Sequence, residues 1–162
     1  MPDIDLDGFD RRILTELQRN GRLTNLDLAE LIGLSPSPCL RRVKRLEQDG
    51  YITGYSARID ERKVGLGLTC FVSVKMERHR EEDAEQLKSA IGGIREIISC
   101  FVTSGEYDML LQIVVPDLDS FRRLMMTTLI KLPGVRDFRT SFAIDTIKDG
   151  VPLPLHHLPD PR

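Results

Sequence analysis

The chain has 162 residues, enough for one domain or two small ones, and 41% of them are hydrophobic and 30% charged. These fractions are typical of a globular protein, and the net charge of −2 argues weakly against a nucleic-acid partner. No apolar run approaches the roughly 20 residues that cross a bilayer, and the acidic start MPDIDLDG lacks a signal-peptide core. We therefore expect a cytoplasmic protein with no membrane partner.

Two helices are predicted first in the chain. The first spans about residues 7–20, and its apolar stripe at helical spacing consists of Leu6, Phe9, Ile13, Leu14 and Leu17. The second begins at Thr24, with Asp27 three residues on as in a capping box, and ends at Gly33. Its expected buried side consists of Leu26, Ala29, Leu31 and Ile32.

A third helix carries the main functional signal. Ser35 or Ser37 can cap it, the prolines at 36 and 38 suit its first position, and Gly50 ends it. The residues expected to face the core are Leu40, Val43 and Leu46. Between Ser35 and Leu46 there is no acid and there are four bases, Arg41, Arg42, Lys44 and Arg45. A short helix, a glycine turn and a basic helix are the layout of a helix-turn-helix, whose second helix enters the DNA major groove.

We expect this basic helix to bind double-stranded DNA. Arg41, Arg45 and Gln48 lie at i, i+4 and i+7, and arginine can bind guanine O6 and N7 in a bidentate pair. Hydroxyls and free N–H groups at the start of the helix suit phosphate contacts. The predicted DNA-binding residues are Ser35, Ser37, Arg41, Arg42, Lys44, Arg45 and Gln48. The alternative is an ordinary solvated basic face, which the agreement of caps, turns and charge disfavours.

The remaining chain predicts a second domain. Residues 51–59 have the aromatic and β-branched content of a strand or wing, and the polar segment 60–67 marks a boundary. Beyond it, alternating and helical patterns predict strands at 68–76, 97–102, 109–115 and 138–147 and helices at 81–91 and after Pro116. The inward residues of the last helix are expected to be Leu118, Phe121, Leu124, Met125 and Leu129.

The order β-α-β-β-α-β is that of a ferredoxin-like unit, so we predict an α+β fold with an N-terminal helix-turn-helix domain. Its expected buried sheet face includes Val72, Val74, Leu111 and Ile113, whereas Phe71 breaks the polar side of the alternation. The expected domains are residues 1–62, residues 63–150, and a proline-rich tail, 151–162, without regular structure.

Groups for catalysis or metal binding are sparse. Cys39, Cys70 and Cys100 are far apart and odd in number, which suits reduced packing residues. His156 and His157 are adjacent in the tail, and two histidines without a third ligand make a weak metal site. We find no nucleophile–base pair, phosphate loop or metal spacing, so we predict no enzyme, no metal site and no cofactor.

Segments from both halves resemble the Lrp/AsnC family of bacterial and archaeal transcription regulators. They are SPSPCLRRVKRLEQDGYI, GLGLTCFVSVKM, TSGEYDMLLQIVVPDLDSF, LPGVRDFRTSFAIDTIK and the late LPL. The resemblance extends from residue 4 to about residue 158. It implies a ligand-binding second domain with the family's regulation-of-amino-acid-metabolism fold.

The resemblance also implies an effector site. The turn of Ser104, Gly105, Glu106, Tyr107 and Asp108 matches the family's G-x-x-D turn, which helps to bind a free amino acid between dimers. Turn N–H groups suit a carboxylate, and an aspartate suits an α-ammonium group. Weaker matches to ligand-responsive positions are Leu118, Thr140, Ser141 and Phe142. From the residues alone, Gly105 could simply permit a tight hairpin.

The implied function is a regulator whose DNA binding or assembly responds to a small amino acid. The resemblance favours leucine or methionine, a dimer formed through the C-terminal sheets, and assembly of dimers to an octamer. By linkage, such an effector must bind the two DNA-binding states unequally. The alternative is a nucleoid-associated protein that wraps DNA without an effector.

Overall fold

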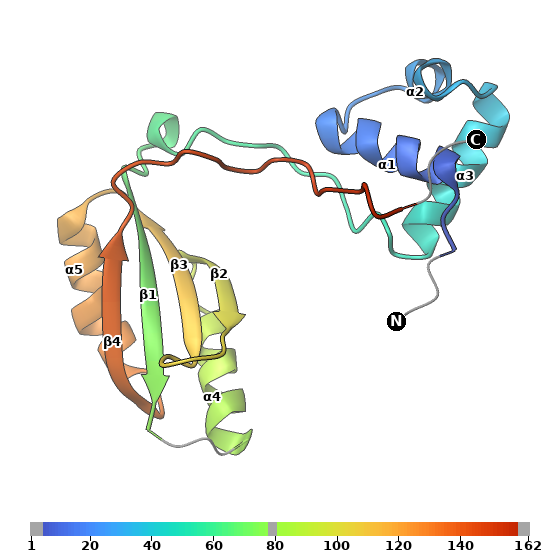
Figure 1. The fold of residues 1–162 in the computed structure, drawn as a ribbon. Coiled ribbons are helices and arrows are strands. Elements are labelled where there is room, and N and C mark those ends of the chain that lie inside the picture. The colour runs from blue at the N-terminus through green and yellow to red at the C-terminus, as the bar shows by residue number, and fades with distance from the viewer. Residues whose placement is uncertain (1–4, 78–80, 159–162) are drawn as a thin grey trace. The chain divides into compact units, whose positions relative to one another are not determined.

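The computed structural model describes residues 5–77 and 81–158. The chain forms two compact units, which we call the helical unit, from residues 1–58 and 148–162, and the sheet unit, residues 59–147. Among the described residues, the first contains three α-helices and the second a sheet with two α-helices (Figure 1). No helix in the described part of the chain is long and apolar enough to cross a membrane.

The helical unit contains α1 (Gly8–Arg19), α2 (Asn25–Ile32) and α3 (Pro36–Gln48), as predicted. The Asp7 carboxylate accepts from the N–H groups of Phe9 and Asp10 at the start of α1, and Thr24 accepts from the N–H of Asp27 at the start of α2. These caps satisfy N–H groups that have no partner inside the helix. They place each helix start where the sequence predicts it.

The buried faces of α2 and α3 include Ala29, Ile32 and Leu46, as predicted, but they leave out three leucines that were expected inside. Leu26, Leu31 and Leu40, expected inside, are 67%, 57% and 43% exposed. The core of the helical unit instead consists of Leu6, Ile13, Leu28, Ala29, Ile32, Cys39, Leu46 and Leu158. Each helical residue turns by roughly 100°, so the stripes centred on Ile32 and Cys39 leave the three leucines on the flanks.

A buried carboxylate joins α1 to α3. Asp10 is 1% exposed, and its two oxygens accept from Arg42 at 2.9 Å and Arg45 at 2.5 Å. The Asp10 carboxylate also accepts from the N–H of Asp7 and so closes the capping box of α1. Arg42 lies 2.7 Å from an Asp7 oxygen, and its guanidinium carbon lies 5.4 Å from the centre of the Phe9 ring. This Asp10 network fixes how α3 is rotated against α1.

Residues 51–59 form no strand, contrary to the prediction. Aromatic and β-branched residues favour a strand only where a partner strand satisfies the backbone, and the described residues of the helical unit form no strand that could pair with this segment. The Tyr55 hydroxyl instead donates a hydrogen bond to the Glu47 carboxylate of α3 at 3.0 Å. The chain then enters the sheet unit through a short 3₁₀ turn, Arg62–Val64.

The sheet unit has the predicted ferredoxin-like topology. Its strands are β1 (Leu68–Met76), β2 (Ile97–Val102), β3 (Met109–Val115) and β4 (Val135–Phe142), and its helices are α4 (Glu81–Gly92) and α5 (Leu118–Thr127). A second 3₁₀ turn, Leu129–Lys131, follows α5. The strand order is β2-β3-β1-β4, with every neighbouring pair antiparallel. The two central strands are therefore β1 and β3.

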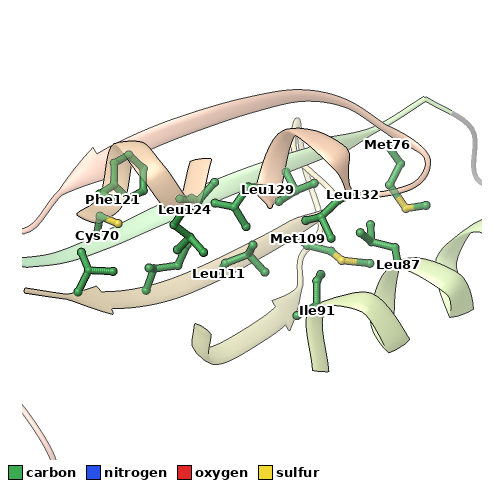
Figure 2. Close-up of a cluster of buried hydrophobic side chains, with 14 residues drawn as sticks. Cys70, Met76, Leu87, Ile91, Met109, Leu111, Phe121, Leu124, Leu129 and Leu132 are labelled. Atoms are coloured by element: carbon green, nitrogen blue, oxygen red, sulfur yellow. The ribbon is translucent and has the colours of Figure 1, made fainter. Parts of the chain in front are cut away.

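Both helices pack on one face of this sheet (Figure 2). Val72, Val74, Leu111 and Ile113 are fully buried there, as predicted, beneath Leu87 of α4 and Leu124 of α5. Leu118, expected to point inward, is 62% exposed at the start of α5. A single chain therefore completes the core of the sheet unit, and the helices of that chain cover only one face of the sheet.

The last strand ends earlier than predicted. β4 stops at Phe142, and Ile144 and Ile147 are 97% and 96% exposed. β4 is an edge strand that pairs only with β1. Because β1 starts at Leu68, the ladder ends with the Ala143 N–H bonded to the Thr69 carbonyl, and β1 provides no further backbone groups to pair with residues 144–147.

We expect Asp10→Ala to lower the free energy of unfolding of the helical unit by about 2 kcal/mol. Removing one partner of a fully buried ion pair costs roughly 3–5 kcal/mol, and the cost is smaller here because both guanidinium groups stay partly exposed. Urea unfolding measures the change, with Asp49→Ala, an exposed acid at the end of α3, as control. If both variants lose the same free energy of unfolding, Asp10 has no special role in the stability of the helical unit.

A pH dependence is expected from Asp7. Burial alone would raise the pKa of this carboxyl, but hydrogen bonds from the Asp10 N–H and from Arg42 outweigh it and hold the pKa below 3.8. A depressed pKa stabilises the folded state above the unfolded value, and this contribution disappears as the pH falls through the folded value. The stability difference between wild type and Asp7→Asn should therefore shrink as the pH is lowered below 3.8. A constant difference would exclude the charge of Asp7 as its cause.

Candidate functional site

One face of α3 points away from the core of the helical unit. Ser37, Arg41, Lys44 and Gln48 lie at i, i+4, i+7 and i+11, and all four are exposed. At roughly 100° per residue they lie opposite the buried stripe of Cys39, Val43 and Leu46. We call these four residues the outer face of α3. It carries two cations and two hydrogen-bonding side chains for a polyanion.

The predicted DNA-binding residues divide into two groups. Arg42 and Arg45 lie on the flank of α3 that meets α1, where both bind Asp10, and they are only partly exposed. The sequence analysis placed Arg45 beside Arg41 because their spacing is helical, but the partner carboxylate lies 35 residues earlier in the chain. One sequence feature could have revealed this pairing. Asp10 lies on the same helical face as the apolar stripe of α1, and a buried acid requires a charged partner.

The start of α3 keeps free donors. Ser35 occupies the N-cap position, yet its side chain makes no capping bond, and Pro36 takes the first helical position. The hydroxyls of Ser35 and Ser37 are on exposed residues. Pro36 and Pro38 have no N–H, and the Cys39 N–H donates to the Ser35 carbonyl, so the Ser37 N–H is the backbone donor that the first turn can offer to an anion. This end of the helix can therefore hold a phosphate oxygen beside the outer face of α3.

In the sheet unit, the hairpin of residues 103–108 closes the turn between β2 and β3. Gly105 has φ +116°, a conformation that side-chain-bearing residues rarely adopt. The turn is braced by the Thr103 hydroxyl, which donates to the Tyr107 carbonyl at 2.9 Å, and by Lys75, whose amine donates to the Glu106 carbonyl at 2.8 Å. Ser104 and Glu106 are exposed and Tyr107 is half-buried. The hairpin thus has a fixed shape with an accessible tip.

Asp108 links this hairpin to the end of β1. One oxygen of its carboxylate accepts from the Met76 N–H at 2.7 Å, at the position where the β1–β4 pairing shifts register. Its own N–H donates to the Val74 carbonyl. A carboxylate with this bond has a structural task in addition to any contact with a ligand.

The other predicted effector residues lie at the far end of the sheet. Phe142 pairs with Cys70, and its ring meets that of Phe121 edge-on at 5.3 Å between centroids. Thr140 is next to Val72 on the helix-covered face, whereas Ser141 points to the opposite face. From Cys70 to Met76, six residues at about 3.3 Å each span about 20 Å. One chain therefore does not bring the hairpin and the Leu118–Phe142 end together.

Nothing in the described residues indicates a metal or a reactive thiol. No group of three or more histidine, cysteine or acidic side chains is gathered there, and the rings of His156 and His157 only meet edge-on. Burial raises the pKa of the Cys70 thiol to about 11 and raises that of Cys39 and Cys100. Cys39 and Cys70 are buried, as expected of packing residues, whereas Cys100 is exposed.

Both halves of the chain match known domain families. Residues 6–53 match a winged helix-turn-helix DNA-binding domain, and residues 69–153 match the Lrp/AsnC ligand binding domain. The second match alone covers more than half of the 162 residues. These two matches assign DNA binding to the helical unit and ligand binding to the sheet unit.

Relatives match over almost the whole chain. The leucine-responsive regulatory protein of Klebsiella pneumoniae is 43% identical over 92% of this chain and 91% of its own length. A transcriptional regulator from Neisseria meningitidis, solved in complex with L-Met, is 41% identical with a TM-score of 0.90, over 94% of this chain and 98% of that one. An AsnC family transcriptional regulator from Agrobacterium tumefaciens is 34% identical with a TM-score of 0.89, over 94% and 99%.

These relatives are transcriptional regulators and not enzymes, which confirms the prediction of a non-enzymatic protein. The domain order, the fold and the identity over nine-tenths of the chain all agree. The chain belongs to the Lrp/AsnC family of transcriptional regulators, with an N-terminal helix-turn-helix DNA-binding domain and a C-terminal ligand-binding domain.

Proposed function

We propose that this regulator binds specific DNA sites through the outer face of α3 and changes its DNA binding or assembly when a small amino acid binds between dimers. The observation that carries the proposal is the separation of roles on α3. Arg42 and Arg45 hold the helix on Asp10, while Arg41 and Lys44 have no ion pair among the described contacts. A rigidly held helix with free cations suits reading of the major groove.

Two kinds of contact are proposed for this face. Arg41, in the middle of α3, can bind the O6 and N7 atoms of a guanine as a bidentate donor. Lys44 is a flexible point charge, which suits a backbone phosphate. One helix reads few bases, so a dimer on a pseudo-palindromic site would supply the rest of the specificity.

Arg41→Ala should weaken binding to a cognate operator by about 1–3 kcal/mol and relax the preference for one base pair. Lys44→Ala should weaken binding to all sequences alike and reduce the salt slope by about 1. Fluorescence anisotropy with operator and random duplexes at several salt concentrations measures both effects.

Arg122→Ala is the matched control, because it removes an exposed arginine from α5 in the sheet unit. Unchanged operator affinity in both α3 variants would move the DNA-reading face elsewhere. Equal affinity of the wild type for operator and random DNA would favour a DNA-wrapping protein over a specific regulator.

For the effector we propose L-methionine or L-leucine. The solved relative in complex with L-Met and the leucine-responsive relatives support this choice. N–H groups of the hairpin around Gly105 would receive the ligand carboxylate, and Asp108 would accept from its α-ammonium group. Because Leu118, Thr140 and Phe142 lie at the other sheet end, they would complete a site only from a neighbouring protomer.

An open sheet face supports the dimer. Phe71 of β1 and Phe101 of β2 lie on the side opposite the helices and are 37% and 56% exposed. Exposed aromatic residues on one face are typical of interaction surfaces. We propose that two protomers pack through this face and that such dimers assemble further to an octamer, with effectors between them.

A thermal-shift panel of the twenty amino acids tests the effector. A ligand at about 100 times its Kd stabilises by about 2.7 kcal/mol, so L-methionine or L-leucine should raise the Tm selectively. Asp108→Asn should abolish this rise, because it removes the charge that would accept from the α-ammonium group, while the amide oxygen can still accept from the Met76 N–H.

Asp137→Asn is the control, since it removes one exposed carboxylate from β4. A full ligand shift in Asp108→Asn would place the amino acid in another site. If none of the twenty amino acids raises the Tm of the wild type, the result would argue for effector-independent DNA wrapping.

A further inference from the structure

The C-terminal segment 148–158, called the tail below, includes the described part of the proline-rich tail and contributes to the hydrophobic core of the helical unit. Leu158 is 7% exposed and belongs to the same buried cluster as Ile13 of α1 and Leu46 of α3. Leu155 packs against that cluster and is partly buried. The proline-rich composition predicts a tail without regular structure. Residues 151–158 form no helix or strand, yet Leu155 and Leu158 contribute to the core.

Polar contacts hold the tail along α1. The Arg11 guanidinium donates to the Leu158 carbonyl at 3.1 Å, and the Leu153 N–H donates to the side-chain oxygen of Gln18 at 2.6 Å. Arg11 and Gln18 lie two turns apart on α1. The tail therefore runs along the helix whose Asp10 orients α3.

A clamp joins the start of the tail to the segment after α3. The Arg58 guanidinium donates to the carbonyls of Asp149 and Gly150 and lies 3.0 Å from the Asp149 carboxylate. Gly150 has φ +52°, and a Cβ atom there would lie 2.6 Å from the Arg58 guanidinium carbon. Only glycine admits this close approach without a shift.

Packing is uneven along the tail. A cavity of about 240 Å³ lies between α1, the segment after α3 and the tail, with Leu17, Tyr55 and Leu153 in its lining. Leu158 is tightly enclosed, whereas Leu153 is 72% exposed. Such a contact contributes less stability than a filled core and opens at lower cost.

We propose that the C-terminal tail is an integral part of the DNA-binding domain, so that the ligand-binding domain is inserted in it and is joined to it by two linkers. The first linker is the segment before β1, residues 59–67. Leu158 acts as a positioning residue for DNA binding through α1. The second linker, residues 143–147, joins the end of β4 to the tail and carries the effector response. The linker role rests on the proposed function, whereas the place of Leu158 does not.

The linker length supports this coupling. Five residues reach at most about 17 Å, which limits how far the end of β4 can move before it pulls on the tail. Thr140, Ser141 and Phe142 are proposed effector residues and directly precede this linker. An effector that moves the end of β4 would thereby change how firmly the tail packs on α1.

Hydrogen exchange on the full-length protein tests the position of the tail. Leu158→Ala should speed exchange of the α1 amides by about tenfold or more and leave β1 and β3 unchanged. Leu153→Ala makes the same chemical change at an exposed tail position and should alter exchange by less than about twofold. Operator affinity should fall about tenfold in the first variant only. Unchanged α1 exchange in Leu158→Ala would overturn the proposal, whether or not the protein binds DNA.

A six-residue Gly-Ser insertion between Ile144 and Asp145 tests the second linker. Operator affinity without effector, and binding of L-methionine or L-leucine, should stay within about twofold, while the effector-induced change in operator affinity shrinks at least about threefold. The same insertion after Arg162 is the control. An undiminished effector response would overturn the coupling role. If the wild type responds to neither amino acid, both the proposed effector and the coupling role are wrong, and the exchange result stands separately.

Discussion

The orientation of the DNA-binding helix depends on one buried carboxylate. Asp10 receives Arg42 and Arg45 from α3 while it closes the capping box of α1. A buried charge is tolerated only when it is paired, so the three side chains stabilise one rotation of α3 and penalise others. Two of the four basic residues in this helix are therefore used inside the domain, and the remaining two face outward.

This division explains how a protein with a net charge of −2 can carry a DNA-binding surface. The electrostatic potential that a protein surface presents to DNA depends on where its unpaired cations are located and not on the net charge of the chain. On α3, ion pairs with α1 neutralise the flank, and the outer face keeps its charge. The same geometry separates residues that maintain the helix from residues proposed to read DNA, although all four look alike in sequence.

In the sheet unit the constraint is topological. Two helices cover one sheet face, and the other keeps exposed aromatic residues. The antiparallel register places the β2–β3 hairpin and the end of β4 at opposite ends of β1. A ligand that uses both ends must lie between protomers, so ligand binding and assembly would be coupled through one site.

The sequence by itself determined the helix-turn-helix, the βαββαβ order, the helix caps and most of the sheet core. These depend on local periodicity and capping, which neighbouring residues encode. Only the tertiary structure decided the side-chain faces of α2 and α3, the pairing of Arg45 with Asp10, the end of β4 at Phe142 and the burial of Leu158. Each of these depends on a partner distant in the chain, so the physical reason is the same. Local pattern specifies which element forms, whereas packing between elements specifies which residues it buries and where it ends.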